Sequence, residues 1–117
     1  MAVYVDNARN AYRGMKMCHM VADRLAELIA MADAIGLPRR HFQAFSHPHF
    51  DLSQSYRARA IAKGAIAVDK HDLVAAMRRH RDLWRSCPGE RAAIAAADRA
   101  SDKGRGRRRA PRPRTAR

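Results

Sequence analysis

The sequence has no long hydrophobic run. No segment of its 117 residues approaches the roughly 20 apolar residues that a membrane-spanning helix needs. The first twenty residues carry Asp6, Arg9, Arg13 and Lys16 in place of the apolar centre of a signal peptide. These absences argue against membrane and exported classes, so we expect a soluble, cytoplasmic protein with no membrane partner.

Cysteine is also scarce. Cys18 and Cys87 are the two cysteines, they lie far apart, and neither belongs to a CxxC pair. This usage excludes a disulfide-rich scaffold and predicts reduced thiols. The phosphate-binding patterns of P-loops and of GxGxxG proteins are absent as well.

Acidic residues are missing from the C-terminal segment. Residues 103–117 hold eight Lys and Arg and no Asp or Glu, which leaves +5 of the net charge of +13 for residues 1–102. Like charges mixed with Gly and Pro predict a disordered tail. Such a tail attracts nucleic acid through phosphates, without the aromatics that stack on bases, or serves only as a solubilising tail. Its arginines are Arg105, Arg107, Arg108, Arg109, Arg112 and Arg114.

The remaining chain, with 47% hydrophobic and 30% charged residues over the whole sequence, is typical of one small globular domain. Short apolar runs bounded by turn residues predict strands, and apolar positions at helical spacing predict helices. The predicted strands are 2–5, 41–45 and 65–68. The predicted helices are 21–35, 52–63, 70–83 and an alanine-rich one at 89–100. Residues 7–20 read as a loop with a helical turn.

Alternating strands and helices predict an α/β fold. We expect a small three-layer domain with a short three-stranded parallel sheet, strand order 2-1-3, and flanking helices. The division along the chain is then an α/β domain at 1–85, an accessory helical segment at 86–102 and the disordered tail at 103–117.

In an open parallel sheet, ligands bind beyond the carboxyl ends of the strands. Asp6 and Asn7 end the first predicted strand, and His47 and His49 follow the second across Pro48. Asp6 is either a metal-binding or catalytic carboxylate or a turn acceptor. The two histidines suit a metal pair but supply too few ligands alone, so metal and cofactor both stay unknown.

The stretch Asp51–Gln54 matches a helix cap, and Asp69 matches a second one. A helix beginning near Leu52 would direct free N–H groups, with Ser53 and Arg57, toward a bound anion.

The segment "MKMCHM" places Lys16 and His19 near the same sheet edge. Cys18 and His19 are sequence neighbours, whose side chains diverge in a strand or a helix, so they do not form a nucleophile–base pair by themselves. His19 remains a candidate general base, because its ordinary pKa is close to neutrality.

The stretches "MAVYVD", "MKMCHMVAD" and "PHFDLSQSYRARAIAKGAIAV" resemble a family of short bacterial and phage proteins known as domain of unknown function 4031. The resemblance covers residues 1–82 and implies that the sheet and its polar segments form one unit. Family members often carry a second acid after the one matching Asp6, where this chain has Asn7. The resemblance implies no particular activity.

Two functions stay open at this point. The first is a module that binds a nucleotide or phosphate-like anion through Asn7, Lys16, His47, Ser53 and Arg57. The second is a hydrolase or nuclease acting on a phosphodiester or nucleotide with Asp6, His19 and His49 as catalytic residues. Whether the protein is an enzyme, and its oligomeric state, are not predicted.

Overall fold

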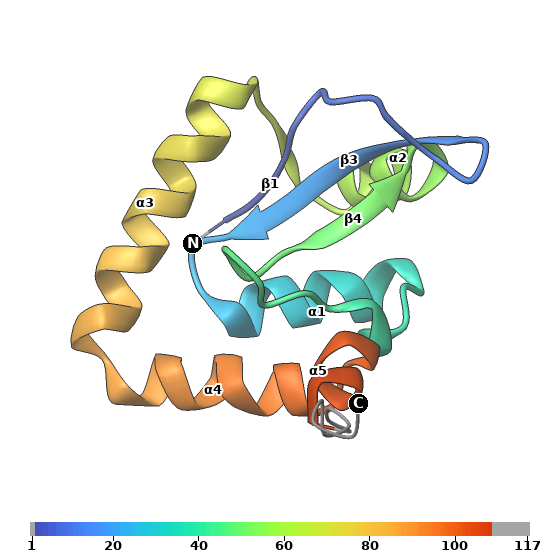
Figure 1. The fold of residues 1–117 in the computed structure, drawn as a ribbon. Helices are drawn as coiled ribbons and strands as arrows, with labels where there is room; N and C mark the ends of the chain where they lie inside the picture. Colours follow the sequence, from blue (N-terminus) through green and yellow to red (C-terminus); the bar gives the residue numbers. More distant parts are fainter. Residues whose placement is uncertain (1, 109–117) are drawn as a thin grey trace, which may run out of the picture.

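The fold is built around β3 (Met15–Ala22), the longest strand of the computed structural model, which describes residues 2–108 (Figure 1). Its side chains alternate between the faces of a mixed five-stranded sheet, as the pleat of a strand requires. The other strands are β1 (Val3–Val5), β2 (Asn10–Tyr12), β4 (Phe50–Ser53) and β5 (Ile66–Ala67).

The predicted three-stranded parallel sheet of order 2-1-3 is wrong. The observed order is β2-β3-β1-β5, with β4 pairing to β3, and only the β1–β5 pair is parallel. The difference arises where a loop with a helical turn was predicted at 7–20, because residues 10–22 form a β-hairpin instead. Arg13 and Gly14 both adopt positive φ, at 49° and 81°, which is the backbone that a two-residue hairpin turn requires.

β1 and β2 share one edge of β3. Met20 pairs with Val5 on one side and Phe50 on the other, so β4 occupies the opposite edge. β2 pairs with β3 further along the same edge as β1, and residues 6–9 connect β1 to β2 without pairing as a strand. This connection lies beside His19 and is where the polar site begins.

The second strand was predicted at 41–45 but lies at β4. His41 ends a short 3-10 helix, η1 (Arg39–His41), and Gln43 forms only an isolated bridge with His49. The apolar signal came from Phe42, which packs against Phe50 in the core at 5.6 Å between ring centroids.

The helices follow the sequence more closely. Helix α1 (Leu25–Ile35) begins later than predicted because Val21 and Ala22 belong to β3, and it ends at the predicted Gly36, with φ 78°. β1 and β5 lie inside their predicted ranges, although β5 is short and its Ile66 is 47% exposed. The remaining predicted helices are α2 (Gln54–Ala62), α3 (Lys70–Ser86) and α4 (Pro88–Arg99).

The two faces of the sheet differ. Cys18, Met20, Phe50 and Leu52 face a core that α1 and α2 complete, and burial of each large side chain contributes about 1.5–3 kcal/mol to stability. On the other face, Val21 packs against Leu73 and Ala76 of α3. α3 stands along one side of the sheet in Figure 1 and covers part of this second face, which leaves a polar remainder.

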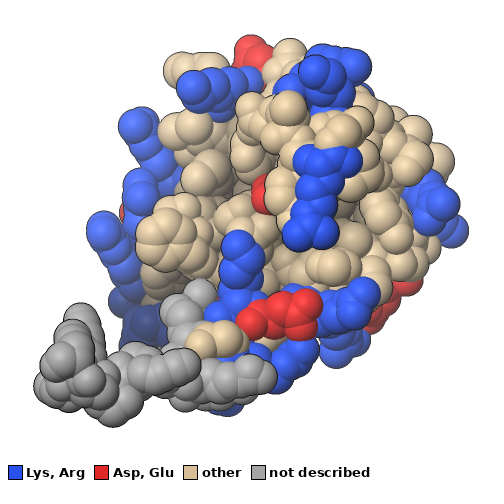
Figure 2. Space-filling view, turned by 45° about the vertical axis from the view of Figure 1, so that its right-hand side comes forward, with Lys and Arg blue, Asp and Glu red and all other residues tan. Residues whose placement is uncertain are grey.

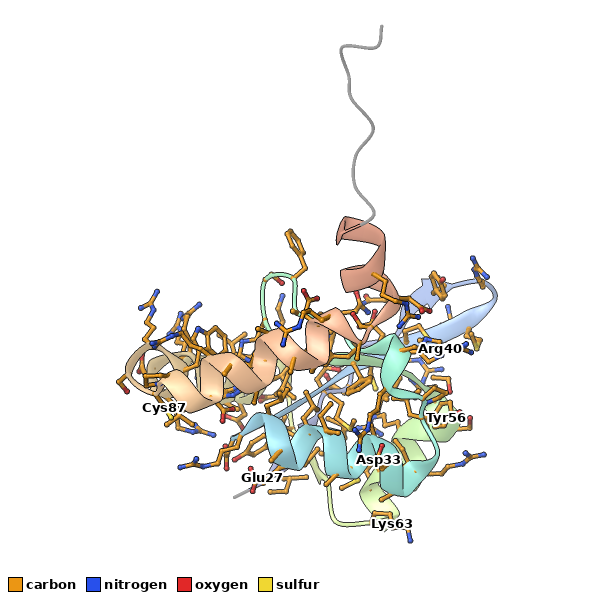
Figure 3. All side chains as sticks on the ribbon, turned by 90° about the horizontal axis from the view of Figure 1, so that it is seen from below. Glu27, Asp33, Arg40, Tyr56, Lys63 and Cys87 are labelled. Atoms are coloured by element: carbon orange, nitrogen blue, oxygen red, sulfur yellow. The ribbon has the colours of Figure 1, made fainter. Side chains whose placement is uncertain are left out.

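Helix α4 runs alongside α1 (Figure 3), and α5 (Asp102–Arg108) follows it. Residues 103–108 of the predicted disordered tail belong to α5, and residues 109–117 lie outside the described residues. Ser101 is fully buried and its Oγ accepts the N–H of Gly104 at 3.0 Å. A Cβ at Gly104 would lie 1.7 Å from the Asp98 carbonyl oxygen, so this close approach requires glycine.

Across residues 2–108, no helix is long and apolar enough to cross a membrane.

Candidate functional site

The side chain of Asp6 continues the hydrogen-bonded ladder between β1 and β3 at the point where β1 ends. Its N–H donates to the His19 carbonyl at 3.2 Å, and its Oδ1 accepts the His19 N–H at 2.9 Å. The Ala8 N–H reaches the same oxygen at 3.3 Å. The carbonyl of Asp6 turns away from the ladder and accepts from Nε of Arg57 at 2.8 Å. The carboxylate thus replaces a main-chain acceptor and is held rigidly.

The second oxygen of Asp6 supports an imidazole. Oδ2 lies 2.8 Å from Nδ1 of His19, whose side chain is 34% exposed. When Asp6 is ionised this oxygen can only accept, so Nδ1 of His19 is the donor, and in the neutral ring Nε2 carries the lone pair. Within the described residues no hydrogen bond engages Nε2. The arrangement orients a histidine with its basic nitrogen available.

A second supported imidazole lies beside the first. The ring centroids of His49 and His19 are 6.0 Å apart. Nδ1 of His49 donates to the His47 carbonyl at 2.6 Å, and Nε2 lies 3.5 Å from Oδ1 of Asp51. Burial alone would lower the pKa of His49, but the contacts with Asp51 and the His47 carbonyl together raise it above its usual value. His49 therefore favours its cationic form.

Asp51 is the matching anion. Its hydrogen bond with His49 outweighs burial and lowers the pKa of the carboxyl group, assisted by a 2.9 Å hydrogen bond from Gln43 Nε2. Asp51 also pairs across the sheet with His19, so the two strands β3 and β4 hold both imidazoles at a fixed register.

Asp6, His19 and His49 border a cavity of about 490 Å³ between the sheet, α3 and the 46–49 loop. His19, His49, Asn7 and Lys70 supply polar side chains to its lining. The further lining residues are Asp6, Ala8, Asn10, Val21, Ser46, His47, Leu73, Val74 and Met77. The cavity therefore combines hydrogen-bonding and cationic groups with apolar walls.

Five of the eight predicted site residues come together here: Asp6, Asn7, His19, His47 and His49. The other three do not line the cavity. Lys16 lies three residues from His19 on β3, and side chains three apart in a strand point to opposite faces. Ser53 caps α2, accepting the Tyr56 N–H at 3.4 Å, and Arg57 holds the Asp6 carbonyl.

Of the two predicted helix caps, one is wrong and one is confirmed. Asp51 lies inside β4 and pairs with His49, so Ser53 takes the N-cap of α2 instead. Asp69 caps α3 as predicted, accepting the Asp72 N–H at 2.8 Å.

Sequence reasoning missed a buried cluster behind His47. The His47 ring lies 5.5 Å from the ring of His80 and 5.2 Å from that of Trp84, both on α3. Burial, with the charges of His80, His49 and Arg81, lowers the pKa of His47 to about 3, so His47 is neutral. His80 lies one helical turn beyond Ala76 on the same face of α3. The sequence could therefore have predicted that His80 is buried.

Glu90 of α4 closes this cluster from the other side. Its Oε2 lies 2.7 Å from Nε2 of His80 and accepts the Leu25 N–H, also at 2.7 Å. One carboxylate thus ties α4 to α3 and to the first turn of α1, where a negative charge is favourable. Nothing in the local sequence of α4 marked Glu90 as buried.

Other candidate groups do not join the site. Burial, reinforced by Asp6, raises the pKa of Cys18 to about 11, and its side chain faces the core. In the described part of the chain, no three His, Cys, Asp or Glu side chains are arranged to hold a metal ion. Among the tail arginines, Arg105 pairs with Asp102, Arg107 and Arg108 end α5, and Arg109, Arg112 and Arg114 lie outside the described residues.

Comparison with known proteins gives one match. Residues 3–80 match the family described as "Protein of unknown function (DUF4031)". The match contains the whole lining of the cavity and ends at His80, so α4 and α5 lie beyond it. No curated protein and no solved structure matches the chain.

Proposed function

Because the chain belongs to the DUF4031 family of proteins of unknown function, we propose its role from its own geometry: the cavity binds a small phosphate-bearing ligand of the nucleotide class. The observation that carries this proposal is the pair of carboxylate-supported imidazoles, His19 and His49, that line one cavity 6.0 Å apart. A cationic His49 and the ammonium group of Lys70 favour an anion there.

The rest of the lining suits the other part of a nucleotide. Val21, Val74 and Met77 offer apolar surface to a flat base, while Asn7 and Asn10 offer amide hydrogen bonds. The volume of about 490 Å³ falls within the range of roughly 300–1,000 Å³ typical of small-molecule sites.

Calorimetric titration with AMP, ribose 5-phosphate and adenosine tests this proposal. We expect AMP to bind and adenosine to bind at least tenfold more weakly, because adenosine lacks the phosphate. His49→Gln and Lys70→Gln should each weaken AMP binding about fivefold, since each removes a cation. Lys63→Gln is the matched control, because Lys63 is an exposed cation outside this cavity (Figure 3). Equal affinities for AMP and adenosine, or no binding of either, would refute the proposal.

A hydrolase acting on phosphodiesters is the second candidate, favoured by the unequal roles of the two imidazoles. In its neutral form, His19 can take a proton from an attacking hydroxyl or water on Nε2, because Nδ1 is held by Asp6. His49, with its raised pKa, can give its Nε2 proton, which otherwise faces Asp51 at 3.5 Å, to the leaving oxygen. Proton transfer by one positioned acid or base group typically raises the rate about 10²–10⁴-fold.

Turnover of bis(p-nitrophenyl) phosphate, measured with and without EDTA, tests this candidate. We expect activity that survives EDTA and falls at least a hundredfold in His19→Ala and in His49→Gln. If wild type and both variants are equally active, or equally inactive, the hydrolase candidate is refuted.

The C-terminal cations are a separate proposal for a nucleic-acid partner. Phosphate contacts by Lys and Arg give affinity that falls steeply with salt and carries no base specificity. Deleting residues 109–117, outside the described fold, should lower the salt dependence of RNA and DNA binding. Unchanged binding after deletion would assign the segment a solubilising role only.

A further inference from the structure

The cationic stripe of α3 continues past the cavity. Lys70, Val74 and Met77 line the cavity from one face of this helix. The spacing of that face continues to Arg81 and then to Arg85, with Arg78 beside them. Arg81 does not line the cavity itself, but it lies one helical turn beyond Met77, which does. A positive track therefore leads from the cavity along α3.

This track has few acidic partners. Of the four arginines of α3, Arg79 alone approaches an acid in the described residues, at 4.0 Å from Asp23. Arginines three or four apart on a helix repel one another, which costs stability unless an external anion lies against them. Figure 2 brings forward the side of the molecule opposite to α3, and basic side chains are spread over that face as well, with acidic ones in a few places. The charge pattern fits an extended polyanion better than one phosphate.

The loop at the cavity rim carries an exposed aromatic ring. Phe45 is 79% exposed, whereas Phe42 and Phe50 are fully buried. The next residue, Ser46, lines the cavity and has φ 62°, a left-handed backbone that is uncommon outside glycine. Strain of this kind, on the order of 1–3 kcal/mol, is found at ligand-binding loops. The loop thus holds an apolar ring in solvent beside the cavity.

We propose that the occupant of the cavity is one nucleotide of a single-stranded nucleic acid, with a neighbouring base stacked on Phe45 and neighbouring phosphates on Arg78, Arg81 and Arg85. The inference rests on the proposed function and names its substrate class. A single strand is required, because a base inside a duplex is stacked on both sides and cannot enter a cavity or lie on an exposed ring.

Fluorescence anisotropy with a labelled 12-nucleotide RNA, the same DNA sequence and its duplex tests the inference on the full chain, with unlabelled AMP as competitor. We expect a single strand to bind at least thirtyfold tighter than AMP and more tightly than the duplex, and AMP to displace it. Comparing RNA with DNA shows which sugar the site accepts.

Two variants locate the contacts. Phe45→Ala should weaken strand binding about tenfold and leave AMP affinity unchanged, because stacking is worth about 1–3 kcal/mol per base. Arg81→Gln combined with Arg85→Gln should reduce the slope of log affinity against log salt by about 1.4, the value for two phosphate contacts on a single strand. Arg40→Gln combined with Lys63→Gln removes two exposed cations elsewhere (Figure 3) and should leave strand binding nearly unchanged.

The outcomes separate this inference from the proposed function. If AMP binds and responds to His49→Gln but the strand binds no tighter than AMP, the strand proposal is overturned and the nucleotide site stands. Strand binding insensitive to Phe45→Ala and to the α3 double variant also overturns it and points to the C-terminal cations. If neither AMP nor the strand responds to His49→Gln or Lys70→Gln, the cavity itself is not the site.

Discussion

Two carboxylate–imidazole pairs lie in different surroundings in this molecule. Asp6 and His19 meet at 2.8 Å beside the cavity, and Glu90 and His80 meet at 2.7 Å between α1, α3 and α4. The side chain of His19 is 34% exposed, whereas that of His80 is 1% exposed. Both pairs join a carboxylate to a ring nitrogen, Nδ1 in His19 and Nε2 in His80, but only His19 is exposed enough to meet a ligand, whereas His80 ties helices together.

Breaking the buried pair should give the largest effect on stability. Glu90→Ala leaves His80 and the Leu25 N–H without their acceptor, and removing one partner of a buried pair costs about 3–5 kcal/mol. Urea unfolding measures this loss, and His19→Ala at the accessible pair should cost about 1 kcal/mol. Similar losses in both variants would contradict the distinction between the pairs.

The next effect concerns His47, which lies between the two pairs and has a pKa of about 3. The unfolded chain takes up this proton near pH 6.5 and the folded chain does not, so stability falls as pH drops between those values. At pH 4.5 the loss is about 3 kcal/mol, at about 1.4 kcal/mol per pH unit.

Urea unfolding at pH 7 and pH 4.5 measures this loss, and His47→Phe should abolish that part of it. His41→Phe, at an exposed histidine, is the control and should keep the wild-type pH dependence. A His47→Phe protein with unchanged pH dependence would show that His47 is protonated in the folded state at pH 4.5.

A smaller effect tests what Asp6 does for His19. In Asp6→Asn the amide oxygen can still accept the His19 and Ala8 N–H groups, so we expect a stability loss of only about 1 kcal/mol. The new amide nitrogen then donates to Nδ1 of His19. Nδ1 must therefore accept, and the neutral ring carries its proton on Nε2 instead. Nitrogen-15 NMR of His19 reports the tautomer, and an unchanged tautomer would refute the positioning role.

The smallest expected effect is the pH dependence of ligand affinity. The pKa of His49 is raised, so its positive charge is present below that pKa and is lost as pH rises through it. AMP affinity should therefore fall a few-fold between pH 6.5 and pH 8.5. His49→Gln should remove this decrease, and a wild-type affinity constant over that range would show that the charge of His49 does not contribute.

The sequence predicted the helices better than the sheet. α1, α3 and α4 have apolar spacing together with a Gly end, an Asp cap or an initial Pro, and these signals are local. The hairpin of β2 and β3 depends on Arg13 adopting a left-handed backbone, for which arginine has no intrinsic preference. The sheet topology depends on pairing between strands that are distant in sequence, such as β3 and β4, and a local sequence pattern does not predict such pairing.

The sequence placed Asp6, His19 and His49 near one another even though the predicted strand order was wrong. Asp6, His19 and His49 come together because each lies on or directly beside a strand that pairs with β3 or on β3 itself. Lys16 does not line the cavity, because residues 15–22 form a strand, in which side chains three residues apart point to opposite faces. Glu90 could not be foreseen, because the packing of α4 against α1 and α3 is set by tertiary contacts.

The replacement of a main-chain acceptor by the carboxylate of Asp6 has a consequence for genetics. In a mutational scan that selects only for folded protein, position 6 should tolerate few residues. Most side chains cannot accept the His19 N–H of β3 at the point where β1 ends. Intolerance at this position would therefore be no sign of catalysis. Asparagine is the informative exception, since it restores the sheet while changing the chemistry offered to the cavity.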